Sequence, residues 1–500
     1  ASNNTAVGNE ALTLNTTGTD NTAVGNQALD ANTTGYNNVA VGDRALTTSN
    51  TGHSNVAVGR YALKSTTTGN SNTAIGDQAL EANTTASNNT ALGFQSLTAN
   101  TTGDGNTAVG GLALDSNTTG NYNVGVGYNA LQSITTGSQN VAVGYQALNT
   151  STASNNTAVG YNALVLNTTG AQNTAVGAYA LDANTDGTEN TAVGYNCLSD
   201  LTTGSYNTGI GHDALENVST GSYNNALGRD AGRNITTGSS NICIGQNAAD
   251  ADNHTGVVAV GSFTLSANTA DYNTAIGYFA SRVNTSGVSN TAVGSNSLEN
   301  NTTGGYNTAV GRASLIANTT ASNNTALGYA ALYANTTGAD VTAVGANALD
   351  ANTTGSYNVA IGKNTLGANT TASNNTAVGT TALLFNTTGA NNTALGMEAL
   401  KANTTGNYNT AVGSLALDAN TTASENTAMG YGTLTNNTTG AYNTAVGRGA
   451  LRENTTASNN TAVGTFAGDV ITSGPNNIII GTGADPSSAT GDSQIVIGVN

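Results

Sequence analysis

The chain has little of what ordinary protein cores and active sites are built from. Its 500 residues include no tryptophan, two prolines and two cysteines, and aromatic residues make up 5%. Charged residues make up 8%, against about 25% in typical globular chains. A conventional core of large side chains is therefore excluded along most of the chain. Small residues in a strict repeat can still form a narrow core.

Positive charge and long apolar runs are scarce as well. The 11 lysines and arginines stand against 28 acidic residues, for a net charge of −17, which argues against nucleic acid as a partner. No apolar run reaches the roughly 20 residues of a membrane span. Ala1 starts directly in a repeat, without a secretory signal. We therefore expect other parts of a longer protein to carry export and anchoring.

The sequence consists of one short unit that is repeated many times. The glycine of "TAVG" recurs 30 times between Gly8 and Gly498, and of the 29 steps 26 are 17 residues long and three are 16. Numbered from Asn4, position one is usually asparagine, position three is nearly always alanine and position five is the glycine. Positions eight and nine are usually "AL", and positions twelve to fourteen "NTT". Seventeen residues are too few for a helical-hairpin repeat.

The unit predicts two short strands and two turns. Thr, Val and Ile favour a strand at "TAV", whereas "NTTG" has turn chemistry. The sequence therefore predicts an all-β fold, a β-solenoid of about 29 coils with strands about 4.8 Å apart, or a rod of roughly 140 Å. We expect one continuous array over 1–500, with an irregular stretch at 229–277 and a C-terminal transition at 465–500.

Alternation along the strand suggests which side chains face inward. We assign positions two and four to the coil's own core, which places position three on the outside. Position three is small except at Ile479 and Val496 near the end, and it is never charged. We therefore predict that it packs against a second copy, most simply in a parallel homotrimer. The residues predicted at this interface are Ala6, Ala23, Ala40, Ala57 and Cys243.

The glycines are candidates for structural turns, and the asparagines of "NTT" are candidates for glycosylation. The glycines of position five are predicted to form structural turns, as in Gly8, Gly25, Gly42, Gly59 and Gly76. "NTT" also matches the acceptor pattern for N-glycosylation. The alternative is that the asparagine only builds the turn. The candidate acceptors are Asn15, Asn32, Asn83, Asn100 and Asn117.

Nothing in the sequence resembles catalytic machinery. His53, His212 and His254 lie far apart and are expected at the surface, and Cys197 and Cys243 stand where alanine is usual. The segment "DADNH" lacks the spacing and terminal Glu of a calcium loop. We therefore expect neither an enzyme nor a cofactor or metal site.

The repeat "NTAVGxxAL" resembles the head repeats of trimeric autotransporter adhesins. The best matches are "NVAVGDRAL" (38–46), "NICIGQNAA" (241–249) and "QIVIGVN" (494–500). The resemblance implies a β-roll, a trimer and a place on the bacterial surface, although that family's unit is shorter. The repeats are also similar to those of tail-fibre-like proteins, whose C-terminal chaperone domain is absent here.

These features lead to one main functional expectation and two alternatives. The main one is a structural and adhesive rod, extracellular or on the cell surface, that binds copies of itself and surface glycans or proteins. Tyrosines at the variable positions, such as Tyr128 and Tyr206, suit polar recognition. The alternatives are an ice-binding solenoid with threonine ladders and a filament subunit that polymerises end to end.

Overall fold

The computed structural model describes residues 1–499 and is all β, with no helix in that range. The chain divides into two units, Ala1–Thr255 and Gly256–Asn500, and each is described by itself. The boundary falls inside the stretch 229–277 that the sequence marks as irregular. Asn500, the last residue of the predicted array, lies outside the described residues.

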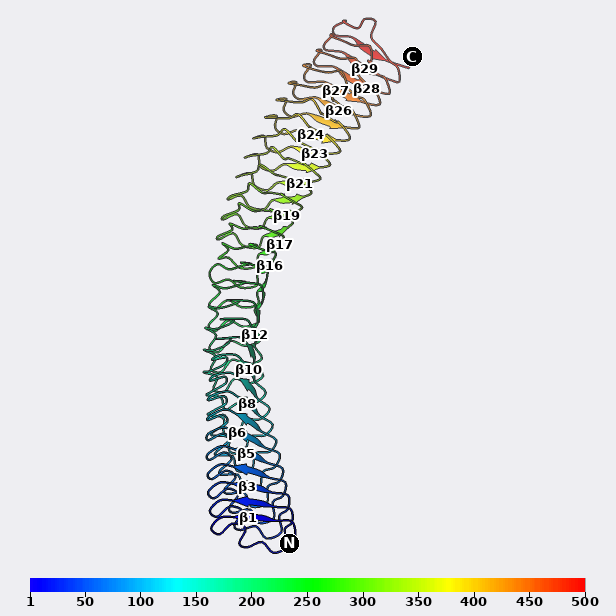
Figure 1. Cartoon of the computed structure of the whole chain (residues 1–500). Coiled ribbons are helices and arrows are strands. Elements are labelled where there is room, and N and C mark those ends of the chain that lie inside the picture. Colours follow the sequence, from blue (N-terminus) through cyan, green and yellow to red (C-terminus); the bar gives the residue numbers. More distant parts are fainter. Residues whose placement is uncertain (500) are drawn as a thin grey trace. The chain divides into compact units, whose positions relative to one another are not determined.

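Each coil contains one strand of three residues, so the prediction of a second strand in each repeat is wrong. In each of the two units the strands lie one above another (Figure 1). In the first unit they are β1 (Thr5–Val7), β2 (Thr22–Val24), β3 (Val39–Val41), β4 (Val56–Val58), β5 (Thr73–Ile75), β6 (Thr90–Leu92), β7 (Thr107–Val109), β8 (Val124–Val126), β9 (Val141–Val143), β10 (Thr157–Val159), β11 (Thr174–Val176), β12 (Thr191–Val193), β13 (Thr208–Ile210), β14 (Asn225–Leu227) and β15 (Ile242–Ile244).

In the second unit they are β16 (Val258–Val260), β17 (Thr274–Ile276), β18 (Thr291–Val293), β19 (Thr308–Val310), β20 (Thr325–Leu327), β21 (Thr342–Val344), β22 (Val359–Ile361), β23 (Thr376–Val378), β24 (Thr393–Leu395), β25 (Thr410–Val412), β26 (Thr427–Met429), β27 (Thr444–Val446), β28 (Thr461–Val463), β29 (Ile478–Ile480) and β30 (Ile495–Ile497). Each coil is named below by its strand.

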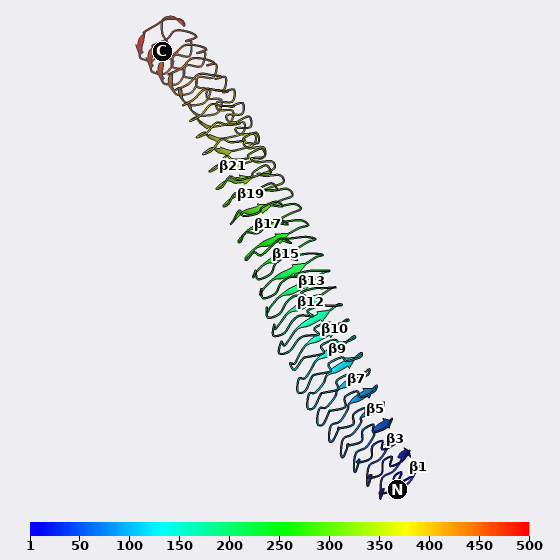
Figure 2. The same cartoon turned by 90° about the vertical axis from the view of Figure 1, so that its left-hand side faces the viewer.

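The strands pair in parallel, in register with the repeat. Thr174 pairs with Thr191, Ala175 with Ala192 and Val176 with Val193, and the same offset of one unit recurs along both units. Figure 2 shows the turns that close each coil before the next strand begins. The predicted β-solenoid of about 29 coils is therefore confirmed, because identical units stack identical residues.

The core lies on the alanine side of each strand. Position three is fully buried, as in Ala23 and Ala40, together with the position-eight and position-nine residues Ala28 and Leu29. The residues on either side of it in the strand, such as Thr22 and Val24, are half-buried or exposed. The predicted assignment of the two faces is therefore wrong. In most coils the Ala-Leu pair leaves room for only a small side chain at position three. The larger Ile479 is buried in coil β29, where it lies beside Gly468, which replaces the usual leucine.

Two ladders of asparagine side chains form the polar part of the interior. The Nδ2 groups of Asn21 (position one) and Asn32 (position twelve) both donate to the carbonyl oxygen of Gly35, at 2.9 and 3.1 Å. Asn32 also donates to Oδ1 of Asn15, one coil earlier, at 3.0 Å. Buried polar groups are costly unless they are hydrogen-bonded. Each asparagine therefore hydrogen-bonds to the backbone of a turn and links it to a neighbouring coil.

The glycine after each strand allows neighbouring coils to approach closely. Gly25 has φ +137°, and a Cβ there would overlap the carbonyl of Gly42 in the next coil. Leu29 is also left-handed, at φ +53°, a conformation that costs a branched residue strain. Its complete burial offsets that strain.

Coils β12 to β14 depart from this interior. Leu201, Val218 and Ile235 replace the position-twelve asparagine, and all three are buried. In coil β14 the usual leucine is Gly232, and the Ile235 side chain lies within reach of the space where a Gly232 side chain would be. An apolar ladder thus replaces a hydrogen-bonded one over three successive coils.

Candidate functional site

The first candidate surface is the outer face of the strands, formed by positions two and four. Position two is mainly Thr or Val, position four is Val, Ile, Leu or Met, and no charged residue occupies either position. Exposed members include Ile75, Leu92, Ile210 and Leu327. We call these two rows the outer row. A continuous uncharged and partly apolar surface is typical of an interaction site.

The residues predicted at a subunit interface do not form this surface. Ala23, Ala40, Ala57 and Cys243 are fully buried within their own coils. Ala6 is exposed only because it belongs to the first described coil. Since these side chains face inward, they cannot contact another copy, and three Cys243 residues cannot meet at an axis.

The candidate glycosylation sites are structural. Asn32, Asn83, Asn100 and Asn117 are fully buried, and each donates its Nδ2 to the carbonyl three residues later. Asn15 makes the same bond at 3.2 Å and is half-buried. A glycan on these amides is incompatible with the fold, which corrects the prediction. The alternative, that the asparagine builds the turn, describes the structure.

The histidines and cysteines occupy separate places. His53 stacks on Tyr36 at 4.6 Å between ring centroids, whereas His254 is buried and its carbonyl accepts a bond from Asn241. The expected surface position of His254 is therefore wrong. Burial raises the pKa of the Cys197 and Cys243 thiols to about 12, and both are unpaired. Neither thiol is a nucleophile in the folded chain.

A second candidate surface is an aromatic ladder in the first unit. It consists of one ring from each of six successive coils, β8 to β13. The rings belong to Tyr128, Tyr145, Tyr161, Tyr179, Tyr195 and His212, with neighbouring centroids 5.2–6.0 Å apart. The first three rings stack, whereas Tyr179 stands at 70° and 86° to its neighbours, because it occupies position seven instead of six.

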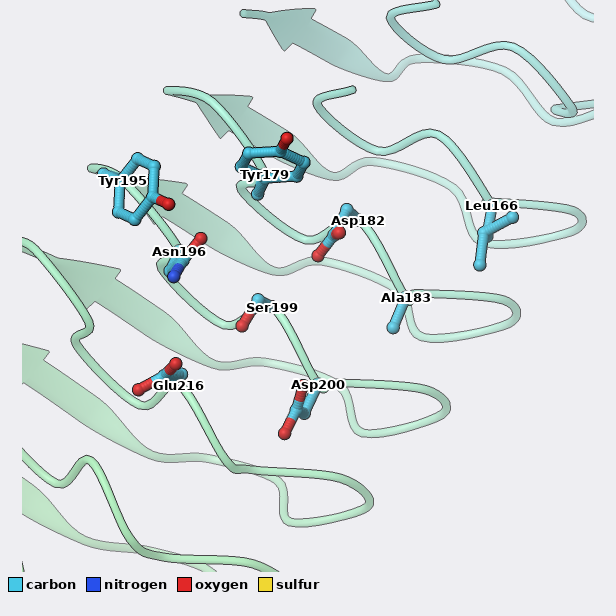
Figure 3. A pocket seen from close by; sticks show the side chains of 9 residues that line it. All are labelled: Leu166, Tyr179, Asp182, Ala183, Tyr195, Asn196, Ser199, Asp200 and Glu216. Atoms are coloured by element: carbon cyan, nitrogen blue, oxygen red, sulfur yellow. The ribbon is translucent and has the colours of Figure 1, made fainter. Parts of the chain in front are cut away.

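An open groove of about 450 Å³ lies beside the turned ring (Figure 3). It is lined by residues of four successive coils: Leu166, Tyr179, Asp182, Ala183, Tyr195, Asn196, Ser199, Asp200 and Glu216. Partial burial, with a smaller contribution from the charge of Asp200, raises the pKa of Asp182 to about 6. Tyr179, Tyr195, Asp182 and Asp200 were not predicted as site residues.

One sequence signal could have found this groove. Between Ser65 and Gly228 there are ten acidic residues and no lysine or arginine. The same stretch contains the whole aromatic ladder. Each feature is weak alone, and the sequence does not show that positions six, seven, ten and eleven of neighbouring coils meet at one surface.

The groove ends at a cluster of charges. Ligand atoms of His212, Asp213 and Asp230 lie within 4.8 Å of one another, a spacing that could hold a metal ion. Arg229 already pairs with Asp230 at 3.1 Å, and Arg233 approaches both Asp213 and Asp230. Because the chain supplies its own cations here, the cluster is better described as an ion-pair network.

Comparison with known proteins gives no family for the chain: no family model matches it, and no curated protein is significantly similar to it. Among the described residues, no helix is long and apolar enough to cross a membrane.

Proposed function

We propose that this chain is part of a structural and adhesive rod, extracellular or on a cell surface, with no catalytic role. The observation that carries the proposal is the repetition of the same coil in both units. Parallel pairing in register presents the same surface at each step, about 4.8 Å apart. Stacked solenoids of this kind provide length and an extended surface instead of a deep pocket. The resemblance to trimeric adhesin and tail-fibre repeats supports the same role.

We propose further that copies of the chain associate through the outer row, as a parallel trimer. This surface replaces the alanine row that the sequence favoured. The outer row is uncharged over its length, and exposed residues such as Ile244, at 39% exposure, leave apolar surface in water. Burying that surface against identical rows is favourable and needs no charge pairing. Identical steps on each copy also keep the rows in register.

The association is tested by measuring mass in solution. We expect the native chain to sediment as a trimer, and a variant with Val143→Lys, Val176→Lys and Ile210→Lys to sediment as a folded monomer. The three lysines would place unpaired charges in the buried interface. A control with lysines at the exposed Tyr206 and Tyr223, which are not members of the outer row, should remain trimeric. A native chain that is monomeric at micromolar concentration would exclude the trimer.

Ice binding is the second candidate, and the outer row is what favours it. Threonine hydroxyls of position two and methyl groups of position four alternate on a flat, uncharged surface with a constant step. The threonines of "NTT" are less suitable, because hydroxyls such as that of Thr118 already donate to the next coil. A thermal-hysteresis measurement separates the two candidates, since adhesion and association require no effect on ice growth.

A further inference from the structure

We propose that the groove between the aromatic ladder and the acidic side chains of coils β11 to β13 binds an alkylammonium group. This inference goes beyond the rod function and does not depend on it. The chain itself shows the ligand chemistry, because three other places combine the same elements and supply their own cation.

The first of these places is in coils β4 and β5. Nζ of Lys64, at position ten, lies 4.6 Å from the centroid of the Tyr61 ring. The same nitrogen lies 3.1 Å from a carboxylate oxygen of Glu81, at position ten of the next coil. An aromatic face and a carboxylate therefore hold one ammonium group between them.

The second place repeats this arrangement in the other unit, and the third place has the same groups there with the ring in the coil of the acid. Arg282 lies 5.1 Å from the centroid of Phe279 and 3.1 Å from Glu299. Arg452 lies 5.8 Å from the centroid of Phe466 and 3.6 Å from Asp469. In each case the ring is at position seven, and the cation and the acid are at position ten of neighbouring coils.

The groove has the ring and the acids without the cation. Tyr179 is at position seven and Asp182 at position ten of coil β11, and Asp200 follows in the next coil. The neighbouring position-ten residues are Val165 and Ser199, both uncharged. Among the described residues no lysine or arginine pairs with Asp182 or Asp200. Arg233 reaches Glu216 at the end of the groove and is bound to it at 2.6 Å.

The rotation of Tyr179 makes the groove suitable for such a guest. Within the stacked part of the ladder each face is turned toward the neighbouring ring, at 9° between Tyr145 and Tyr161. Tyr179 is nearly perpendicular to Tyr195, which breaks the stack where the carboxylates gather. Ammonium groups bind preferentially over an aromatic face, and Figure 3 shows Asp182 and Asp200 farther along the same coils from the rings.

Two sources could supply the ammonium group: a free polyamine or a lysine side chain of a partner polypeptide. The experiment is titration calorimetry of the full chain at low salt with two probes, spermidine and a tetralysine peptide. We expect saturable binding at one site per chain for at least one probe. The probe that binds more tightly identifies the source. Affinity should fall as salt is added, because the site is open to solvent.

Variants separate the groove from the general negative charge of the chain. Asp182→Asn with Asp200→Asn should weaken binding by about tenfold or more. The matched control is Asp115→Asn, which removes a position-ten carboxylate from a coil with Gly111 and Leu112 at the ring positions. This control should bind like the native chain. Equal weakening in the control and the double variant would overturn the proposal, as would the absence of saturable binding.

A further variant fills the groove from within. Ser199→Lys places a lysine at the position that Lys64 occupies in its coil, within reach of the position-ten acids of the neighbouring coils. We expect it to abolish probe binding while the thermal unfolding temperature is unchanged or raised. Undiminished binding in this folded variant would show that the probes bind elsewhere. Neither result depends on whether the chain forms a trimer or adheres to a surface.

Discussion

The two faces of each strand differ in what they tolerate. On the inner face, position three is Ala in most coils, with Gly125, Gly209 and Cys243 as small replacements and the larger Ile479 and Val496 in the last two coils. On the outer face, one residue away on either side, Val, Ile, Leu, Met and Thr are all accepted. Volume restricts the inner row because the coil is narrow and closely packed. Charge is excluded from the outer row, although nothing in a single chain covers it. The inner row therefore serves the fold, and the outer row is free to serve contacts with other molecules.

The largest expected difference between the two faces is chemical reactivity. Cys243 is in the inner row, where burial raises its pKa to about 12. In a Cys197→Ala background, its reaction with a thiol reagent at pH 8 should be about a thousandfold slower than that of an ordinary thiol. A cysteine moved to the outer row, with Cys243→Ala and Ile244→Cys, should react at an ordinary rate. Similar native-state rates for the two would contradict the assigned faces.

Enlarging the inner row should have the next largest effect. Ala175→Leu inserts three carbon atoms into a filled interior and should lower the free energy of unfolding by about 3 kcal/mol. Because each coil contacts only its neighbours, the loss should appear as local opening near β11. Hydrogen exchange and urea denaturation measure both effects. Val176→Leu, the adjacent outer-row control, should change stability by no more than about 0.5 kcal/mol.

A smaller loss is expected from the asparagine ladder. Asn100 donates to Asn83 and to the carbonyl of Gly103, and accepts from Asn117. Asn100→Ala should cost about 2 kcal/mol in urea denaturation, because it leaves buried partners unsatisfied. The apolar ladder provides the comparison: Val218→Ala removes volume without unpairing a polar group. If Asn100→Ala were neutral, the ladder would not hold the turns.

The smallest expected effect is the pH dependence of the groove. Burial, more than the neighbouring Asp200, raises the pKa of Asp182 to about 6, so the folded chain binds this proton more tightly than the unfolded chain. Stability should therefore fall slightly as the pH rises from about 4 through 6, where Asp182 loses its proton in the fold. Asp182 is partly exposed, so solvent reduces the effect.

The Asp182→Asn variant isolates this titration from the others nearby. Asp200 is next to Asp182, and the Glu216–Arg233 pair lies farther along the groove. Subtracting the thermal unfolding curve of the variant from that of the native chain, pH by pH, should leave a decline with its upper limit near pH 6. A difference that rises with pH would mean that the carboxylate is stabilised in the fold and not destabilised.

Much of the fold can be predicted from the sequence because the repeat is nearly strict. Gly8, Gly25 and their counterparts give the length of the coil, and "TAV" marks the strand. The two faces could not be predicted in the same way. Alternation separates Ala23 from Thr22 and Val24, but either set can be called the inner one. Apolar residues usually face inward, and this preference leads to the wrong choice when the interior is too narrow for them.

The groove could not be predicted from the sequence for a different reason. Tyr179 and Asp182 belong to one coil, Tyr195 and Asp200 to the next, and their positions in the unit vary freely. Only the stacking of coils places these residues of neighbouring coils next to one another. The cation–aromatic contacts at Tyr61, Phe279 and Phe466 can be recognised as related only when it is known which positions of neighbouring coils lie side by side.

The sequence alone determined that this protein is a β-solenoid, because a repeat of 17 residues with strand and turn signals has few other ways to stack. It also determined that most coils would present the same residues at each step. The tertiary structure alone decided that alanine faces the core and that Val, Ile and Thr face outward. The space inside a closed coil decides which side chains face inward. That space is limited only once the chain has folded into a coil.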